Sequence, residues 1–278
     1  MVKTDGSSKW RELGLPPPKK RIVYAYRCTV KACGIFFFGL FSLLMGLVII
    51  PLQKLFLRPA SRARKAARKA CSVFFRLFLG GLRLLGTLKM DLGDLAFYRS
   101  VKSTLVVANH PSLYDMMILI SLFPNADCVV NKSLTKGVLA WVVRGMYTLN
   151  DMGYEALVAS CRQSLADGAV IIIFPEGTRT PRQGAVPYKR GAAHIAHETG
   201  ADLLPVYIGG NDKYGLGKHD PLFSYNPTEV YSYYVRPLEE VHAADYASLS
   251  SPMAARRMTE RVHELLAKEA LARDNRVI

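Results

Sequence analysis

The sequence predicts an α/β fold: a single domain with a mostly parallel or mixed sheet covered by helices, preceded by an N-terminal membrane helix and a basic amphipathic helix. From about residue 90 onward, short β-rich runs alternate with helical stretches. The β-rich runs are almost continuously apolar, which is typical of strands buried on both faces of a sheet. A long run without any charged residue lies ahead of this pattern, and it predicts the membrane helix.

The run 32–53 has no charged residue and is long enough to span a bilayer as a helix, for which about 20 residues suffice. An uncharged run of this length is not typical of a buried core helix. It begins too late for a signal peptide, and no small-residue cleavage site follows it. We therefore divide the chain into a basic N-terminal segment, 1–31, a membrane-attachment segment, 32–90, and a catalytic domain, 91–278.

A second helix is expected at about 61–86, basic on one face and apolar on the other. Its apolar face would contain Phe74, Phe75, Phe78, Leu79, Leu82 and Leu85, and its cations would include Arg62, Lys65, Lys69 and Arg76. Eight Lys or Arg precede the apolar run, whereas residues 54–90 contain ten and no Asp or Glu. Because both flanks are basic, a spanning helix and a helix that enters one leaflet and returns both remain open.

A net charge of +15 calls for an acidic partner, either nucleic acid or an anionic lipid surface. The positive charge is concentrated beside the most apolar stretch, and no module with stacking aromatic residues is present, so the membrane surface is the expected partner. The cysteines are odd in number and contain no C-x-x-C pair, which indicates a reducing, cytoplasmic environment and no zinc site. They are Cys28, Cys33, Cys71, Cys128 and Cys161.

Within the catalytic domain, strands are expected at 104–108, 126–130, 169–174, 203–208 and 230–235. Helices are expected at 112–122, 133–146, 152–167, 189–199 and 253–272. Such sheets bind ligands at the carboxyl ends of their strands, where His110 and Glu176 would lie.

Four residues separate His110 from Asp115, just after the first of these strands. Asp115 could accept the Nδ1–H of the imidazole, fix its tautomer and let the ring remove a proton from a hydroxyl. Pro111 suits the first turn of a helix, so Asp115 is expected in the second turn. The alternative is a histidine that caps a helix beside a surface aspartate, since the spacing also occurs by chance. No nucleophile-elbow pattern surrounds Ser112, so direct transfer is expected.

The segment Phe174-Pro175-Glu176-Gly177-Thr178-Arg179 follows a second apolar run. Gly177 allows the backbone to approach a ligand closely, and Arg179 supplies a forked cation suited to phosphate. Glu176 could hydrogen-bond a hydroxyl of the acceptor. The alternative is an ordinary turn with a solvated arginine.

In this order, the two segments resemble the motifs of the glycerolipid acyltransferase family, the lysophosphatidic acid acyltransferase-like enzymes. Asn109-His110-x-Ser112-x-x-Asp115 is similar to the catalytic motif, and 174–179 is similar to the acceptor-binding motif. Lys189-Arg190-Gly191 and Leu204-Pro205-Val206 resemble two less specific blocks, and the resemblance covers about residues 100–210.

The resemblance implies a glycerol-3-phosphate acyltransferase-like fold, with acyl-CoA or acyl carrier protein as donor and with no cofactor or metal. It implies His110 as general base and Asp115 as its partner, supported by Asn109 and Ser112. The acceptor and phosphate site would contain Glu176, Gly177, Thr178, Arg179 and Lys189.

One block departs from the family pattern, because Asp151 stands where relatives commonly carry an arginine that helps to hold the phosphate of the acceptor. An aspartate would repel a phosphomonoester at close range. Arg144, Arg182, Lys189 or Arg190 could compensate.

Other features carry little chemistry. His194 and His197, with Glu198 beside them, have the spacing of metal ligands on one face of a helix. No further ligand is apparent in the sequence, so a solvated helix face is expected. The glycine-containing stretch 209–219 is interpreted as a surface loop. The helix at 253–272 is interpreted as amphipathic and packed on the core.

We therefore expect a membrane-bound O-acyltransferase at the cytoplasmic face of a bacterial inner membrane, with 1-acyl-glycerol-3-phosphate as the default acceptor in phospholipid synthesis. Two alternatives remain open. The same chemistry could serve another lipid-linked or lysolipid acceptor, or the chain could be a membrane-anchored lipid-binding protein without catalysis. Nucleic-acid binding is not expected.

Overall fold

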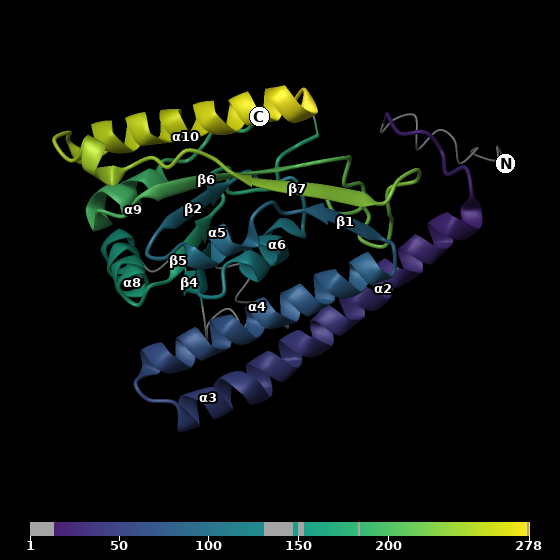
Figure 1. Ribbon diagram of the computed structural model, residues 1–278, viewed down its shortest axis with the longest axis horizontal. Helices are drawn as coiled ribbons and strands as arrows, with labels where there is room; N and C mark the ends of the chain where they lie inside the picture. Colours follow the sequence, from purple (N-terminus) through teal and green to yellow (C-terminus); the bar gives the residue numbers. More distant parts are fainter. Residues whose placement is uncertain (1–13, 131–146, 150–152, 183, 277) are drawn as a thin grey trace.

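The computed structural model describes residues 14–130, 147–149, 153–182, 184–276 and 278, and Figure 1 shows their arrangement. In this part of the chain, seven strands form one sheet in the order β1-β7-β6-β2-β5-β3-β4. All neighbours are parallel except β6 and β7, which are antiparallel. The predicted fold class, an α/β domain with a mixed sheet covered by helices, is confirmed. The strands are β1 (Leu88–Asp91), β2 (Leu105–Ala108), β3 (Ala126–Val130), β4 (Thr148–Leu149), β5 (Val170–Ile173), β6 (Leu203–Gly209) and β7 (Tyr231–Pro237).

The centre of the sheet is β2, which pairs with β5 on one side and β6 on the other. All four of its residues are buried, and they alternate between two cores. Leu105 and Val107 face one core, and Val106 and Ala108 face the other. A strand that is covered on both faces must be apolar at every position, which is why this run was recognisable in the sequence.

Helices cover both faces of the sheet (Figure 1). One core includes buried side chains of α8 (Tyr154–Ala166), α9 (Gly191–Thr199) and α10 (Ser251–Asp274). The other includes those of α4 (Ala60–Leu84) and α6 (Asp115–Leu122). The helices expected at 112–122, 152–167, 189–199 and 253–272 correspond to α6, α8, α9 and α10, and the one expected at 133–146 lies outside the described residues.

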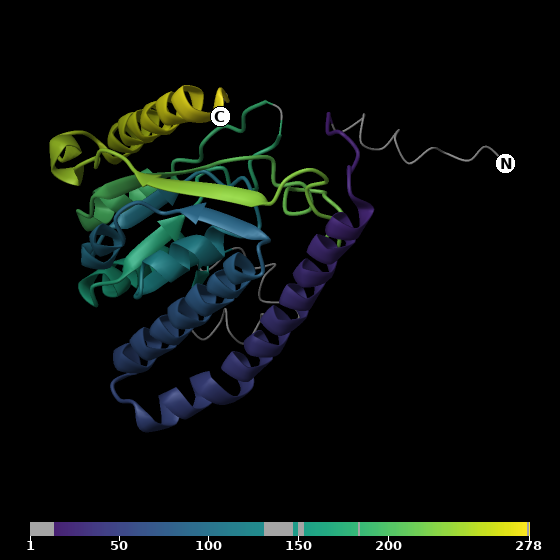
Figure 2. The ribbon, with the colours of Figure 1, turned by 45° about the vertical axis from the view of Figure 1, so that its right-hand side comes forward.

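The N-terminal part of the chain forms a long helical hairpin beside the sheet (Figure 2). Helix α2 (Arg21–Leu44) continues through a π-helical turn, Met45–Ile49, into α3 (Ile50–Phe56), and α4 returns along it. Among the described residues, Arg21–Phe56 is the one helix long and apolar enough to cross a membrane, judged by length and composition.

The apolar face of α4 points into the protein and not, as expected, toward a lipid interface. Phe75, Leu79 and Leu82 are buried, and Phe74 stacks on Phe41 of α2. This side of α4 is needed to cover α6 and the sheet, so it is unavailable to a bilayer.

A buried ion pair joins α4 to the sheet. Arg68 is 4% exposed, and its Nη2 lies 2.7 Å from Oδ2 of Asp127 in β3, which is fully buried. The charge of this basic helix is therefore not all at the surface. No pattern in the sequence indicated that one of its cations pairs with the domain.

Candidate active site

The first motif begins at the carboxyl end of β2, where Asn109 fixes the backbone. Its Nδ2 donates to the carbonyl of Ile208 in β6, and its Oδ1 accepts from the Ile208 N–H, each at 2.8 Å. Asn109 is 2% exposed. A buried side-chain amide that pairs with both the N–H and the carbonyl of one residue holds the ends of two strands at a fixed separation.

His110 and Asp115 are brought together as the sequence predicted. Nδ1 of His110 lies 2.9 Å from Oδ2 of Asp115, which is fully buried. The same carboxylate accepts from the Ser112 N–H at 2.6 Å and from the Ser112 hydroxyl at 2.5 Å. An ionised carboxylate only accepts hydrogen bonds, so it selects the tautomer in which Nδ1 donates and Nε2 is the free base.

The turn between these two residues differs from the prediction. Helix α6 begins at Asp115, so this residue stands in the first turn and not in the second. The cause is the set of hydrogen bonds from Ser112 to the Asp115 carboxylate, which hold residues 112–114 in a turn ahead of the helix.

The imidazole ring is held on its face as well as at Nδ1. It stacks on Phe174 with ring centroids 4.0 Å apart and an interplanar angle of 14°. Within the described part of the chain, Nε2 has no hydrogen-bond partner, and the His110 side chain is 19% exposed. The ring is therefore oriented by the protein while one nitrogen stays accessible.

Glu176 joins the second motif to the first. Its Oε1 accepts from the His110 N–H at 3.2 Å and from the Thr180 hydroxyl at 2.6 Å, and the Thr180 N–H donates to the His110 carbonyl at 2.7 Å. Glu176 is 3% exposed, and burial raises the pKa of its carboxyl, whereas these two hydrogen bonds to Oε1 lower it and compensate only in part. Its other oxygen, Oε2, is buried without a partner among the described residues, so one acceptor remains unused beside His110.

Gly177 is needed for its backbone conformation and for space. Its φ is +65°, a region that favours glycine, and its N–H donates to the carbonyl of Phe174. A Cβ at this position would lie 2.7 Å from Nζ of Lys189. The N–H of Lys189 also donates to the carbonyl of Pro175, so the lysine lies across the turn.

His110, Gly177 and Lys189 are among the residues that line an open cavity of about 430 Å³. His110, Arg179 and Lys189 supply its base and its cations, and the turn 177–178 contributes backbone. Its apolar wall comes from several helices and strands: Met116, Val129, Val130, Leu157, Ile173, Phe174, Pro175, Ala192 and Ile195.

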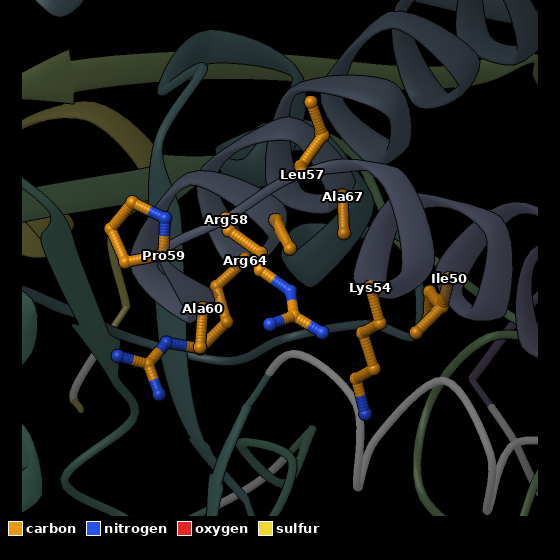
Figure 3. Close-up of a pocket in the computed structure, with 9 residues that line it drawn as sticks. Ile50, Lys54, Leu57, Arg58, Pro59, Ala60, Arg64 and Ala67 are labelled. Atoms are coloured by element: carbon orange, nitrogen blue, oxygen red, sulfur yellow. The ribbon is translucent and has the colours of Figure 1, made fainter.

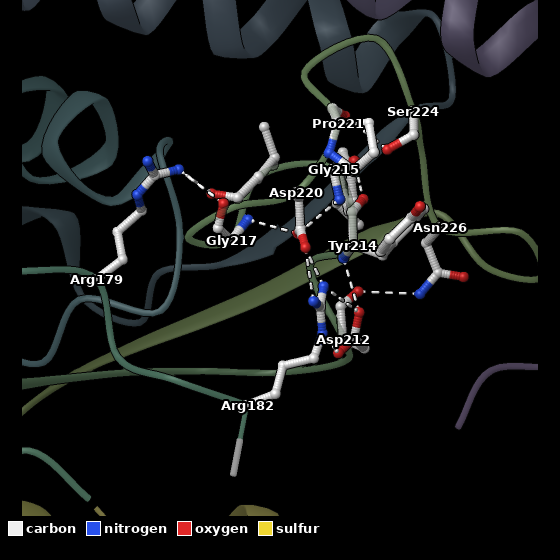
Figure 4. Close-up of polar contacts among 12 residues, drawn as sticks. Arg179, Arg182, Asp212, Tyr214, Gly215, Gly217, Asp220, Pro221, Ser224 and Asn226 are labelled. Carbon is white, nitrogen blue, oxygen red and sulfur yellow. Dashed lines mark hydrogen bonds and ion pairs between the residues drawn. The ribbon is translucent and has the colours of Figure 1, made fainter. Parts of the chain in front are cut away.

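Arg179 is only partly available to a ligand. Its Nη1 donates to the carbonyls of Leu216 and Gly217, at 3.0 and 2.8 Å (Figure 4). Nε and Nη2 have no partner among the described residues. The loop that supplies the two carbonyls also accepts a bond from the Leu113 N–H, at the Leu216 carbonyl, so it supports both motifs.

This loop was predicted to lie at the surface, which is correct for Lys218 and His219 but wrong for residues 213–216. Lys213, Tyr214 and Leu216 are at most 5% exposed. Asp220 accepts from the N–H groups of Gly215 and Gly217, which closes the backbone into a compact turn (Figure 4). Internal hydrogen bonds of this kind allow a loop to be buried without unpaired peptide groups.

Arg182 is not available to replace the missing arginine of the family. Its guanidinium makes four hydrogen bonds to Asp212 and Asp220, at 2.6 to 3.2 Å (Figure 4). It therefore stabilises the loop. Asp151 and Arg144 lie outside the described residues, and of the other two candidates only Lys189 lines the cavity.

The long α2 helix also contacts this loop. Lys31 is 2% exposed, and its Nζ donates to the carbonyls of Gly215 and Ser224 at 2.6 and 2.7 Å. A charge in the N-terminal segment that was expected to flank a membrane helix is thus part of the catalytic domain.

Sequence reasoning missed two residues at the site. The Tyr233 hydroxyl lies 2.8 Å from the Ser112 hydroxyl, behind Asp115, and Thr180 bridges Glu176 to His110. Tyr233 was interpreted only as part of an alternating strand. A contact between residues 121 positions apart leaves no periodic signal in one sequence.

Within the described residues, His194, His197 and Glu198 do not form a metal-ligand group. Among the described residues, the group whose ligand atoms lie within 4.8 Å of one another is Asp202, Glu240 and His242, of which the first two are partly buried and His242 is exposed.

Comparison with known proteins gives a family match and a set of similar proteins. Residues 95–209 match the family model described as Acyltransferase. The chain is 28% identical over 213 residues to the 1-acyl-sn-glycerol-3-phosphate acyltransferase of Helicobacter pylori, covering 73% of this chain and 81% of that one. It is 28% identical over 131 residues to the protein of the same name from Haemophilus influenzae, covering 44% of this chain and 55% of that one.

The fold is that of a solved structure in the same group. The crystal structure of the 1-acyl-sn-glycerophosphate (LPA) acyltransferase from Thermotoga maritima superposes with a TM-score of 0.65 at 20% identity, covering 93% of this chain and 99% of that one. The chain is thus an acyltransferase. Its matched region and its relatives are similar to the lysophosphatidic acid acyltransferase-like enzymes of the glycerolipid acyltransferase family.

Proposed function

We propose that this chain is a membrane-bound O-acyltransferase that moves a fatty acyl group from acyl-CoA or acyl carrier protein to the hydroxyl of 1-acyl-glycerol-3-phosphate, in phospholipid synthesis. The observation that carries the proposal is the 2.9 Å contact between His110 Nδ1 and the buried Asp115 carboxylate, with Nε2 left accessible. The names of the two bacterial relatives support the same acceptor.

In the proposed reaction, the acceptor hydroxyl oxygen attacks the thioester carbonyl carbon while Nε2 of His110 takes the hydroxyl proton. The new C–O bond forms, the C–S bond breaks, and the leaving thiolate takes up the proton from Nε2, which restores the free base. Each turnover yields one ester and one free thiol. Asp115 stays ionised and stabilises the imidazolium, and a general base of this kind contributes ~10²–10⁴-fold to the rate.

The walls of the cavity suit the acceptor and the acyl chain. Lys189 and the free nitrogens of Arg179 provide positive charge for a phosphate, and the apolar wall can cover a hydrocarbon chain. The N–H groups of Thr178 and Arg179 have no acceptor among the described residues, and we assign them as candidate donors to the developing oxyanion.

We also infer that the N-terminal hairpin attaches the enzyme along one side and does not cross the bilayer. Helix α2 packs on α4 through stacked phenylalanines, and α4 packs on α6 in the domain. The opposite side of α2 exposes large apolar residues, among them Phe36, Phe37 and Leu40. Inverted membrane vesicles expose the cytoplasmic face on the outside. Protease added to such vesicles should therefore cleave tags placed at both ends of the chain. Protection of one tag alone would contradict this arrangement.

The catalytic assignment is tested by thiol release with matched acyl-CoA and acyl carrier protein donors. His110→Ala and Asp115→Asn should each lower kcat by at least ~10²-fold, whereas His242→Ala, which removes an exposed histidine outside the site, should not change it. Thiol release that persists at the wild-type rate in His110→Ala would refute the general-base role. A mass increase of one acyl chain on the added lysolipid identifies the acceptor.

A further inference from the structure

The closed end of the N-terminal hairpin contains a second cavity, of about 560 Å³, between α3 and the start of α4 (Figure 3). Its floor is apolar and well packed: Ile50, Ala63 and Ala67 are 4%, 3% and 2% exposed. Leu57, Pro59 and Ala60 complete the apolar lining, and the three other lining residues are Lys54, Arg58 and Arg64. This hairpin cavity therefore combines an apolar floor with cationic walls.

Among the described residues, only one of the three cations of the hairpin cavity, Arg64, has a carboxylate within 4 Å. Arg64 lies 3.8 Å from Asp167, and both side chains are partly exposed to solvent. Lys54 and Arg58 contact no carboxylate among the described residues, and residues 54–90 contain no Asp or Glu at all. Lys54 and Arg58 are exposed to solvent, which weakens the repulsion between them, and an anion bound between the cations would be attracted by all three.

Arg68, one turn beyond Arg64 on the same helix, makes the contrast clear. It is buried and paired with Asp127 at 2.7 Å. Where a cation of this helix serves the fold, the protein supplies the carboxylate. At the hairpin cavity, Arg64 has a carboxylate at 3.8 Å, and Lys54 and Arg58 have none among the described residues.

The surroundings of the hairpin cavity indicate which anion would fit. The adjoining tip of the hairpin exposes Leu52, Leu55 and Phe56 at 48%, 67% and 75%. Exposed apolar side chains beside unpaired cations match an amphiphile with a charged head and hydrocarbon tails. Free phosphate would satisfy the cations only.

We propose that the hairpin cavity binds the phosphate of an anionic phospholipid through Lys54, Arg58 and Arg64. The inference rests on the proposed membrane attachment and adds a specific site to it. The lipid is structural and is not the acyl acceptor, because the hairpin cavity shares no lining residue with the cavity at His110. Its phosphate holds the tip of the hairpin at the lipid headgroups.

The test compares two double variants with the same change in charge. Lys54→Gln/Arg58→Gln removes two cations of the hairpin cavity, and Arg62→Gln/Lys65→Gln removes two exposed cations of α4 outside it. Binding of the full-length protein is measured by cosedimentation with vesicles of phosphatidylcholine, with and without phosphatidylglycerol. If the hairpin cavity is a specific site, Lys54→Gln/Arg58→Gln should lose at least ~10-fold more affinity for the anionic vesicles than Arg62→Gln/Lys65→Gln. General surface attraction predicts equal losses, and that result would overturn the proposal.

A third variant keeps the charge constant. Ala60→Phe places a ring at the exposed mouth of the hairpin cavity and should reduce the preference for anionic vesicles without affecting binding to phosphatidylcholine alone. An unchanged preference would count against the site. If inorganic phosphate binds to the wild type and not to Lys54→Gln/Arg58→Gln while both sediment equally with vesicles, the occupant is free phosphate and the lipid assignment is wrong.

The proposed acyl transfer is tested by a separate assay, which does not depend on vesicle binding. Thiol release from a short-chain donor in detergent should be equal in all these variants, since none touches the site at His110. If the wild type does not sediment with any vesicle, the membrane attachment itself is refuted. If it sediments and the two double variants behave alike, only the hairpin cavity site is refuted.

Discussion

Replacing Arg68 by methionine tests how firmly the hairpin is joined to the catalytic domain. The change keeps an unbranched apolar side chain in place but leaves the Asp127 carboxylate buried without its cation. Breaking a buried ion pair by removing one partner costs ~3–5 kcal/mol. Asp127 keeps four donors, from Cys128, Ser164 and both the N–H and hydroxyl of Thr148, so we expect the lower end of this range, ~3 kcal/mol.

The free energy of unfolding can be measured by urea denaturation in detergent micelles, followed by circular dichroism. A loss of ~3 kcal/mol corresponds to an approximately 10²-fold decrease in the ratio of folded to unfolded protein. Lys69→Met is the matched control, because Lys69 is the next residue and is exposed, and it should change stability by less than ~0.5 kcal/mol. The double variant Arg68→Met/Asp127→Asn should recover most of the loss, since it leaves no unpaired buried charge.

Two results would refute this reasoning. A loss in Arg68→Met no larger than that in Lys69→Met would mean that the pair does not stabilise the native state. A double variant that is less stable than the single one would mean that Asp127 depends on its other donors and not on Arg68.

Three further predictions concern a turn, a buried lysine and the cysteines. Gly177→Ala combines an unfavourable φ with a close contact to Lys189. It should destabilise the fold by ~1–3 kcal/mol and raise the KM for the lysolipid. An unchanged KM would show that Lys189 is not part of the acceptor site. Burial lowers the pKa of Lys213 from 10.5 to about 8, so between about pH 8 and pH 10.5 the unfolded chain binds more protons than the folded protein. The free energy of unfolding, measured by denaturation at a series of pH values, should therefore rise with pH across this range in the wild type relative to Lys213→Met. A difference between the two proteins that does not change with pH would contradict this prediction. Burial raises the pKa of Cys71 and Cys161 to about 12 and that of Cys128 well above its usual value, so mass spectrometry after maleimide treatment of the native protein should find these three unlabelled and the exposed Cys33 labelled.

The parts of the fold that were predictable are those with a strong local pattern. Strands such as β2 and β5 are apolar at every position because both faces are covered, and this leaves an unbroken run in the sequence. The pairing of His110 with Asp115 was predictable because a short spacing after a strand restricts where the two side chains can lie. The strands β1 and β4 were missed, since one contains Lys89 and Asp91 and the other has two residues.

What could not be predicted depends on contacts between distant segments. The apolar face of α4 has the same spacing whether it packs on a sheet or on lipid, and only the position of α6 decides between them. The loop 209–219 has the composition of a surface loop, but Asp220 and Arg182 pair its polar groups internally, which permits burial. Tyr233 and Thr180 reached the site in the same way, through contacts that sequence spacing does not encode.

The burial of Lys31 in the loop beside the active site restricts how the long N-terminal helix can move. A rotation by one residue turns an α-helix by ~100° and shifts it by ~1.5 Å, and either would withdraw Nζ from the carbonyls of Gly215 and Ser224. The exposed apolar side of α2 therefore keeps a fixed orientation relative to His110. In the proposed membrane-attached state, His110 would therefore always approach the membrane surface from the same direction.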